Sequence, residues 1–346
     1  MKEVRVGLVG YGMSGSVFHA PLITGVQGLT LAKVVSSNPA KVNAVYPQTE
    51  VVPHIDGLLS DPAIDLVVVT TPNPTHYPYA RQALEAGKHV VVEKPFANSV
   101  QDADRLIDLA AEKNLKLSVF QNRRWDNDFL TVKKCVQEGL LGDIYTYQVH
   151  YDLFRPEISS KWKEHSGEGS GALYDLGSHL IDQALHLFGL PKTVYADLAK
   201  QRVGAEVDDY FHVVLGYDTL RVILQSGWVV KKPGPHFLVH GSKGSFLKYG
   251  FDPQQNDLQR GLRPGHPEWG RDKEAFYAEL AVGNELNAVA KVETIPGSYQ
   301  SFYQGLYTAI AQGGPLPVAA TEARDGIRVI EAAQMSVREQ RVVTLL

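Results

Sequence analysis

The chain has 346 residues, 44% of them hydrophobic and 21% charged, and its formal net charge is −4 at pH 7. At about 150 residues per domain, this length predicts roughly two domains. The acidic balance excludes a general nucleic-acid binder, which needs a surplus of basic residues. There is no apolar run of about 18 residues and no signal-peptide pattern, so we expect a cytoplasmic protein without a membrane segment.

Cysteine usage points the same way. The single cysteine, Cys135, cannot form an internal disulfide or a thiolate zinc cluster, and it fits a reducing compartment. It lies in a helical pattern over residues 129–138, where a structural role is expected. We therefore predict no metal site.

The first third of the chain alternates short apolar runs with helical segments such as 79–86 and 100–113. Strands buried on both faces read as continuous apolar runs, and helical crossovers between them imply a parallel sheet. We predict a doubly wound, Rossmann-type α/β domain over residues 1–124. Its expected strands are 4–9, 29–35, 66–70, 89–92 and 116–120.

Longer strands joined by short turns follow, which favours antiparallel hairpins. We predict an α+β domain over residues 125–346, with an open, largely antiparallel sheet and a helix over 172–188. The expected strands are 144–154, 194–201, 210–217, 220–230, 237–239 and 245–249. Helices on one face would leave the other face to be covered, and a second subunit is the expected cover.

Two later segments carry weaker signals. Aromatic and aliphatic residues recur at helical spacing over 299–310, which favours a core helix over a ligand site. The segment 252–270 is rich in turn-forming residues, and it is either a mobile flap or an exposed connection.

A glycine-rich turn directly follows the first strand and opens a helical segment. In this context the first glycine makes a tight turn, the second lets the backbone approach a pyrophosphate, and the third allows close helix–strand packing. A glycine-rich turn without a ligand is the alternative. The predicted cofactor-binding residues here are Gly10, Tyr11, Gly12, Met13, Ser14 and Gly15.

The end of the second strand indicates which dinucleotide is bound. Sites that prefer NAD place an acidic residue about 20 residues after the glycine turn. Here the strand ends in Ser36 and Ser37, with Lys41 beyond. Hydroxyls and a lysine can hold a 2′-phosphate that a carboxylate would repel. We predict NADP as the cofactor, with a site that tolerates both cofactors as the alternative.

Three clusters suit hydride transfer from an alcohol. One follows the strand at 66–70, a second ends the strand at 89–92, and the third places Asp175 and His179 four residues apart, on one helix face. A histidine suits the role of proton acceptor, and a lysine can stabilise a developing alkoxide. The residues of the first two clusters are Thr71, Pro72, Asn73, His76, Glu93 and Lys94, followed by Pro95.

These motifs identify a resemblance to the Gfo/Idh/MocA family of oxidoreductases, which extends over essentially the whole chain. Its most specific marks are Glu93-Lys94-Pro95 and Asp175 with His179, and the tail 319–346 is also similar to the family's closing helix and strand. Segments 15–22, 122–126 and 152–156 most resemble the branch of NADP-dependent scyllo-inositol dehydrogenases.

The resemblance implies a Rossmann domain followed by a domain with a large open sheet, assembled as a homodimer or homotetramer through that sheet. It implies catalytic roles for Lys94, Asp175 and His179, with His179 as general acid/base. Besides the residues above, it places Glu93, Lys94 and Asn122 at the cofactor. The family's commoner acid is replaced by Ser36, which agrees with the charge argument for NADP.

A polyol pocket needs several hydrogen-bonding side chains and an apolar wall. We predict substrate contacts from Lys94, Asp175 and His179, together with residues at and after the domain junction; the alternative is a structural role for several of the latter. The junction candidates are Asn122, Arg123, Arg124, Asp152, Arg155 and Trp162. His19 is expected to be a packed or capping histidine.

The predicted function is therefore an NADP-dependent dehydrogenase that reversibly oxidises a secondary ring alcohol, with scyllo-inositol as the best candidate substrate. The alternatives are a dehydrogenase of aldoses, a regulator that senses a dinucleotide without catalysis, and a glycosidase that uses a retained dinucleotide. The expected binding partner is a small polyol or sugar substrate. We expect no binding to nucleic acid or to a membrane.

Overall fold

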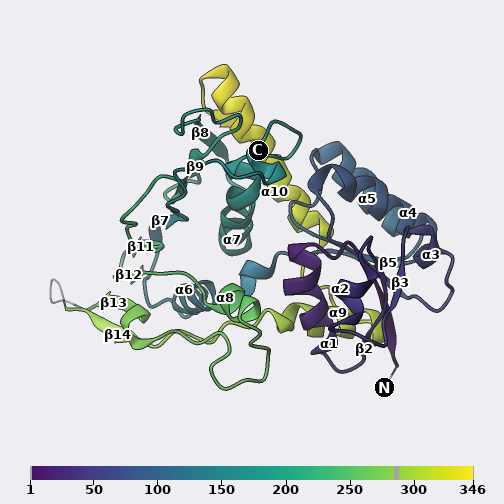
Figure 1. Cartoon of the computed structure of the whole chain (residues 1–346). Coiled ribbons are helices and arrows are strands. Elements are labelled where there is room, and N and C mark those ends of the chain that lie inside the picture. Colours follow the sequence, from purple (N-terminus) through teal and green to yellow (C-terminus); the bar gives the residue numbers. More distant parts are fainter. Residues whose placement is uncertain (1, 284–287, 346) are drawn as a thin grey trace. The chain divides into compact units, whose positions relative to one another are not determined.

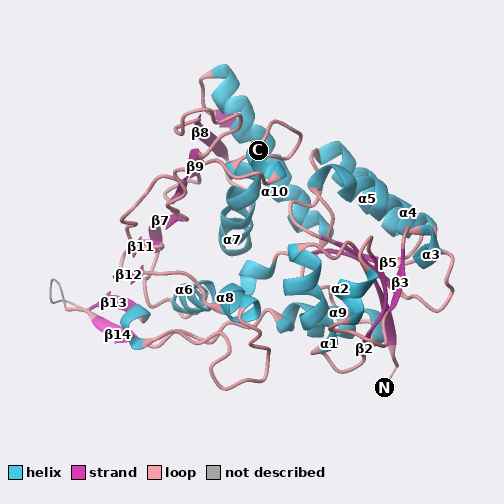
Figure 2. Ribbon diagram, viewed as in Figure 1, coloured by secondary structure: helices cyan, strands magenta, loops and turns pink. Residues whose placement is uncertain are grey.

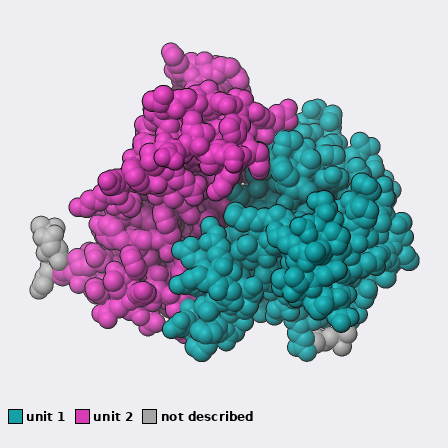
Figure 3. All heavy atoms as spheres, in the orientation of Figure 1, with its two compact units in different colours: residues 1–122, 254–269, 298–324 teal, residues 123–253, 270–297, 325–346 magenta. Residues whose placement is uncertain are grey.

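The computed structural model describes residues 2–283 and 288–345, which form two compact units (Figure 3). Unit 1 comprises residues 1–122, 254–269 and 298–324, and unit 2 comprises 123–253, 270–297 and 325–346. The predicted domain boundary at residue 124 lies close to the end of the first segment of unit 1. The predicted ranges differ from these units because the two later segments, 254–269 and 298–324, belong to unit 1. The predicted ranges also include residues 1, 284–287 and 346, which lie outside the described residues.

Unit 1 contains a parallel sheet that confirms the predicted doubly wound fold. Within the described part of the chain it has six strands in the order β3-β2-β1-β4-β5-β6. Strand β3 was not predicted because its three residues are too few to show an apolar run. The strands are β1 (Val4–Val9), β2 (Leu29–Val35), β3 (Glu50–Val52), β4 (Leu66–Val69), β5 (His89–Val92) and β6 (Leu117–Val119).

Helices cover both faces of this sheet. In Figures 1 and 2, α1 (Ala20–Thr24), α2 (Pro39–Asn43) and α9 (Gln300–Ala311) lie on one side of the strands. On the other side lie α3 (Asp56–Leu59), α4 (His76–Glu85) and α5 (Val100–Glu112). The carboxyl ends of the parallel strands therefore share one edge, where ligands bind in folds of this kind.

Helix α9 fills part of the core of unit 1. The four aromatic residues of the pattern and Leu306 are buried, and Ile310 is half-buried, so the prediction of a core helix is confirmed. The segment 252–270 is neither a flap nor a bare connection, because it contains α8 (Gln254–Gln259), which contacts the helix after the glycine turn. The buried aromatic residues of the pattern are Tyr299, Phe302, Tyr303 and Tyr307.

Unit 2 is built on an open sheet. Its strands in the described residues follow the order β14-β13-β12-β11-β7-β10-β9-β8-β15, and β7 and β10 pair in parallel whereas their other neighbours are antiparallel. The strands are β7 (Ile144–His150), β8 (Thr193–Ala199), β9 (Tyr210–Gly216), β10 (Arg221–Gly227), β11 (Phe237–Gly241), β12 (Gly244–Lys248), β13 (Ala278–Val282), β14 (Ala290–Val292) and β15 (Val343–Thr344).

The helices of unit 2 lie along one face of this sheet (Figure 2). They are α6 (Asn127–Gln137), α7 (Ser178–Phe188) and α10 (Ala320–Glu339), and α10 begins within unit 1. Cys135 is buried in α6, as expected for a structural cysteine. No helix of the described residues is long and apolar enough to cross a membrane.

Candidate active site

The glycine turn has the geometry that a dinucleotide requires. Gly10 has φ +100°, which only glycine adopts without strain, and a Cβ on Gly15 would lie 2.3 Å from the Gly10 carbonyl oxygen. A Cβ on Gly12 would meet open space. The exposed Gly12 and Met13 begin a helix whose first turns are π-helical, over Ser14–His19, without a side-chain cap. The turn thus leaves backbone donors for a phosphate.

The predicted selectors of the 2′-phosphate lie beside this turn. Gly10 N–H donates to the Val35 carbonyl at 3.1 Å, so Ser36, the next residue, follows β2 directly next to the turn. The Lys41 ammonium donates to the Tyr11 carbonyl at 3.1 Å and lies 5.4 Å from the Tyr11 ring centroid. Ser37 is exposed. Ser36 and the Lys41 ammonium thus both lie beside the glycine turn.

The loop after β4 is tied to the turns on either side of it. Thr70 donates its hydroxyl to the carbonyl oxygens of Val9 and Gly10, at 3.0 and 2.9 Å. His76 is fully buried, and its ring nitrogens lie 2.8 Å from the carbonyl oxygens of Thr71 and Pro95. Burial lowers the pKa of His76 despite these two acceptors. His76 is therefore a link between two loops, while Pro72 is exposed and Asn73 buried.

Glu93 is the centre of a buried network at the end of β5. One carboxylate oxygen, Oε1, accepts from Ser14 Oγ and, at 2.9 Å, from His19 Nε2, and Oε2 accepts from the Lys94 backbone N–H at 2.9 Å. Burial alone would raise the pKa of Glu93, but the hydrogen bond and charge of His19, with the Ser14 hydroxyl, lower it to about 2. His19 is packed, as expected, and although it is the N-cap residue of α1, its side chain makes no capping hydrogen bond.

In unit 2 a second π-helical turn carries the predicted catalytic aspartate. Asp175 lies in this turn, Leu173–Gly177, and His179 lies in the first turn of α7, so the predicted helix over 172–188 is interrupted in its winding. Asp175 is half-buried and His179 is 5% exposed. Asp175 contacts the Lys163 ammonium, a residue that sequence reasoning missed because no motif marks it.

Asp208 anchors the start of this helical segment. Its Oδ2 accepts from the Leu173 N–H at 2.8 Å, and a Cβ on Gly171 would lie 2.1 Å from its Oδ1. Burial raises the pKa of Asp208 to about 6, against the lowering effect of the backbone donors. The carboxylate and the glycine together fix where the helix bearing Asp175 begins.

The two arginines after Asn122 are engaged in structural bonds. Arg124 makes a bidentate pair with Asp182, both contacts at 2.8 Å, with side chains 5% and 4% exposed. Arg123 donates to Asp126 at 3.0 Å and to the Tyr151 hydroxyl at 2.9 Å. These contacts support the alternative that the arginines are structural. Asn122 itself is buried at the end of unit 1.

The remaining substrate candidates divide in the same way. Asp152 is buried, and its Oδ1 accepts from the Gly227 N–H at 2.9 Å, which ties the segment after β7 to the end of β10. Arg155 and Trp162 are exposed, and the Arg155 guanidinium lies 6.0 Å from the Trp228 ring centroid. Arg155 and Trp162 are thus accessible, whereas Asp152 is held within its own domain.

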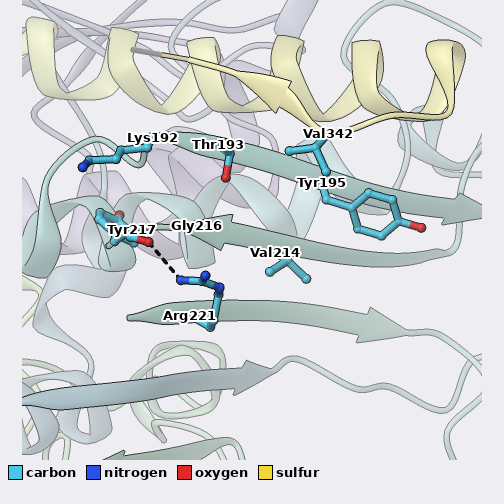
Figure 4. A pocket seen from close by; sticks show the side chains of 8 residues that line it. All are labelled: Lys192, Thr193, Tyr195, Val214, Gly216, Tyr217, Arg221 and Val342. Carbon is cyan, nitrogen blue, oxygen red and sulfur yellow. Dashed lines mark hydrogen bonds between the residues drawn. The ribbon is translucent and has the colours of Figure 1, made fainter. Parts of the chain in front are cut away.

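A shallow pocket of about 370 Å³ lies elsewhere on unit 2 (Figure 4). It is formed at β8, β9, β10 and the approach to β15, and Lys192, Tyr195 and Arg221 line it. It includes none of the predicted site residues. It is a groove on the surface of the sheet, and we assign it no catalytic role.

Comparison with known proteins decides the family. Residues 4–121 match the model of an oxidoreductase family with an NAD-binding Rossmann fold, and residues 133–345 match the C-terminal alpha/beta domain of the same family. The chain belongs to the Gfo/Idh/MocA family. It is an oxidoreductase that uses a nicotinamide dinucleotide and acts on a small molecule.

Individual Gfo/Idh/MocA relatives match over nearly the full length. The chain is 46% identical to scyllo-inositol 2-dehydrogenase (NADP(+)) IolW of Bacillus subtilis, over 99% of this chain and 96% of that one. It is 44% identical to the uncharacterized oxidoreductase YdgJ of Escherichia coli, over 99% of both chains. The solved structure of Bacillus subtilis yvaA covers 100% of both chains with a TM-score of 0.96 and 43% identity. A Bacillus cereus oxidoreductase gives 0.92 and 34%, covering 99% of each chain.

Proposed function

We propose that this enzyme is an NADP-dependent dehydrogenase that reversibly oxidises a secondary ring alcohol of a cyclic polyol, with scyllo-inositol as the best candidate and its ketone, scyllo-inosose, as product. The observation that carries the proposal is the 46% identity, over nearly the full length of both chains, with an enzyme named for that substrate and cofactor.

The preference for NADP is supported by the chain's own residues. Where an NAD site usually places a carboxylate, Ser36 follows β2, and its hydroxyl accepts from the Asn38 N–H at 3.1 Å. The Lys41 ammonium is held at Tyr11 in the glycine turn. A charge-assisted hydrogen bond to a phosphate is roughly twice as strong as a neutral one, so Lys41 favours the phosphorylated cofactor.

The catalytic roles proposed here follow from the chemistry of alcohol oxidation. The bound cofactor supplies a nicotinamide ring that takes the hydride from the carbinol carbon. The hydroxyl proton must leave at the same time, and His179 is the proposed acceptor because a histidine titrates near neutral pH. Lys94 orients the hydroxyl and stabilises negative charge on its oxygen. In the reverse direction, His179 returns the proton to the carbonyl oxygen.

Asp175 is proposed to bind a hydroxyl of the substrate. Its contact with Lys163 favours the ionised carboxylate, which can only accept hydrogen bonds. A polyol offers donors to such an acceptor, and a substrate that lacks the hydroxyl leaves the carboxylate without its donor. Such sites discriminate strongly against the deoxygenated analogue.

Self-association through the sheet of unit 2 is also part of the proposal. The helices of unit 2 lie on one face, and Tyr145, Tyr195 and Val214 are among the partly or fully exposed residues of the strands. A homodimer or homotetramer would cover them, and sedimentation analysis distinguishes these assemblies from a monomer. We further propose a cytoplasmic location, in keeping with the single, buried Cys135.

The proposed reaction is tested by following NADPH absorbance with a panel of substrates. The panel comprises scyllo-inositol, myo-inositol, glucose, xylose and cyclohexanol, each with NADP and with NAD. The proposal requires the highest kcat/KM for an inositol with NADP. A higher value for an aldose would replace it with a sugar dehydrogenase. Tight NADPH binding without turnover of any substrate would replace it with a sensor.

A further inference from the structure

A buried chain of polar contacts runs from α9 to the end of β5 in unit 1. The Tyr303 hydroxyl lies 2.5 Å from His19 Nδ1, and His19 Nε2 lies 2.9 Å from Glu93 Oε1. Tyr303 and His19 are both fully buried. The His19 ring also packs against Phe120, with centroids 4.2 Å apart. Polar groups so placed must satisfy one another, because water does not reach them.

The carboxylate fixes the direction of one of these two hydrogen bonds. An ionised carboxylate only accepts, so His19 Nε2 carries a hydrogen and donates to Glu93. When the ring is neutral, its Nδ1 has a lone pair, and the Tyr303 hydroxyl is the donor that satisfies it. The Glu93 carboxylate thus selects the form of His19 that carries hydrogen on Nε2, and the Tyr303 hydroxyl holds the ring at Nδ1. This is the way in which a third group orients a histidine in many active sites.

The π-helical turn after the glycine turn explains why two residues of one helix reach the same oxygen. Ser14 and His19 are five residues apart, the interval of π-helical hydrogen bonding. Both contact Glu93 Oε1. In an ordinary α-helix, residues five apart do not share a face. The departure from α-helical geometry thus serves a contact with Glu93, and π turns recur at functional sites.

Glu93 joins two segments that the proposed function requires. Its Oε1 is bound to the helix that follows the glycine turn, and its Oε2 accepts from the backbone N–H of Lys94 at 2.9 Å. We propose that Glu93 is a positioning residue, held by Tyr303 and His19, which fixes the Lys94 turn relative to the glycine turn. This inference rests on the proposed function, since it assumes that Lys94 is catalytic and that the glycine turn holds the cofactor.

This assignment differs from the sequence prediction that Glu93 contacts the cofactor. The carboxylate oxygens of Glu93 already accept from Ser14, His19 and Lys94, and the network keeps the pKa of Glu93 at about 2. Contacts within the protein thus already occupy both carboxylate oxygens of Glu93. Ser14, also predicted to bind the cofactor through the turn, gives its hydroxyl hydrogen to Glu93 and retains its backbone N–H for a phosphate.

The decisive experiment compares two tyrosines of α9. Tyr303→Phe removes the hydroxyl that orients His19. Tyr307→Phe is the matched control, because Tyr307 is also buried on α9 and its hydroxyl donates to the Lys2 carbonyl at 3.0 Å. Both variants lose one buried hydrogen bond, so a comparable decrease in Tm is expected from each. Glu93→Gln is the second test variant, since one of its two acceptor oxygens becomes an NH2 group, which must then face either the Lys94 N–H or the donors Ser14 and His19.

Hydrogen–deuterium exchange of the protein without cofactor gives a readout independent of activity. In peptides covering residues 92–99, Tyr303→Phe and Glu93→Gln should accelerate exchange at the Lys94 turn, and Tyr307→Phe should not. NADPH affinity and kcat/KM should both fall about tenfold or more in the two test variants, as for loss of a buried hydrogen-bond partner. Raising the cofactor concentration should not restore the activity of Tyr303→Phe, because kcat should fall as well as NADPH affinity.

Two outcomes overturn the inference. One is unchanged exchange at the Lys94 turn in both test variants. The other is an equal loss of NADPH affinity in Tyr303→Phe and Tyr307→Phe, which would reduce Tyr303 to a packing role. If the wild-type enzyme turned over no polyol, the proposed substrate would fail instead. The exchange and NADPH-binding comparisons would still decide whether Glu93 positions the two turns.

Discussion

The Lys41 ammonium lies on Tyr11, donating to its carbonyl oxygen at 3.1 Å and standing 5.4 Å from its ring centroid. This contact holds a positive charge at the second residue of the glycine turn. Lys41 belongs to the short helix α2, whose first turn is capped by Asn38, which accepts from the Lys41 N–H at 3.0 Å. The segment after β2 is thus ordered by local contacts, and its cation does not depend on a ligand for its position.

Replacing Lys41 should change cofactor preference. Lys41→Met would remove the proposed charge-assisted contact to a 2′-phosphate, a loss of about 1.5–3 kcal/mol, so kcat/KM with NADP should fall about ten- to a hundredfold. The value with NAD should change little. Ser36→Asp should likewise weaken NADPH binding more than NADH binding. Lys113→Met, at the exposed end of α5, is the control. An equal effect on both cofactors would contradict the phosphate assignment.

Removing either of the proposed catalytic groups should lower turnover. Lys94→Ala and His179→Ala should each reduce kcat by about 10² or more, the usual size of an acid–base or electrostatic contribution. NADPH affinity, measured by fluorescence, should be retained in His179→Ala, whose residue lies in unit 2. Turnover near the wild-type level in either variant would remove that residue from the mechanism.

Lys163 should act through Asp175, with which it forms an ion pair. Lys163→Met should lower kcat/KM for the polyol about tenfold while leaving NADPH affinity unchanged, because Lys163 stabilises the carboxylate proposed to bind substrate. The double variant with Asp175→Asn should be little worse than Asp175→Asn alone, since contacting residues are not additive. Additive losses in this double-mutant cycle would show that the two residues act separately.

The fold was largely predictable because its strands in unit 1 are continuous apolar runs, and the glycine turn follows β1 directly. Short strands such as β3 and β14 have three residues each and leave no recognisable period. The return of residues 254–269 and 298–324 to unit 1 is a tertiary event that local patterns do not encode. The pattern of α9 predicted a core helix, but it did not predict that this helix packs in the core of unit 1.

The candidate site divides along similar lines. Residues within a motif, such as Gly10 and Lys94, were found because the motif itself implies their chemistry. Lys163 and Asp208 lie outside any motif, 12 and 35 positions from the residues of the Asp175 segment that they contact. His19 was expected to pack or to cap a helix. Its contacts with Tyr303 and Glu93 join residues that are 284 and 74 positions away, and no spacing rule predicts them.

Asp208 should make stability depend on pH. Its pKa is about 6 in the folded protein and near 3.8 when unfolded, so the folded state binds more protons between these values. The free energy of unfolding should therefore fall as pH rises from about 4 through 6, by linkage. Asp208→Asn keeps an acceptor for the Leu173 N–H and should flatten this dependence in urea titrations. The exposed Asp218→Asn is the control, and an unchanged slope in Asp208→Asn would contradict the assignment.

The buried ion pair of Arg124 and Asp182 should contribute much more to the free energy of unfolding than an exposed ion pair does. Arg124→Met leaves the Asp182 carboxylate buried without its bidentate partner and should cost about 3–5 kcal/mol of unfolding free energy. Arg124→Met with Asp182→Leu should be less destabilised than Arg124→Met, because no lone charge remains. The control is Arg81→Met, whose exposed pair with Glu85 contributes about 0.5 kcal/mol or less.

This comparison also separates the two interpretations of Arg124. If the Arg124 guanidinium binds only Asp182, the KM of the double variant Arg124→Met with Asp182→Leu for the polyol should lie within about twofold of the wild-type KM. Loss of a substrate contact of about 1 kcal/mol would raise it further. A large rise in KM with NADPH affinity unchanged would instead support the substrate contact that the sequence predicted. Urea denaturation and steady-state kinetics on the same preparations make both measurements, so a loss of folded protein cannot be mistaken for a loss of binding.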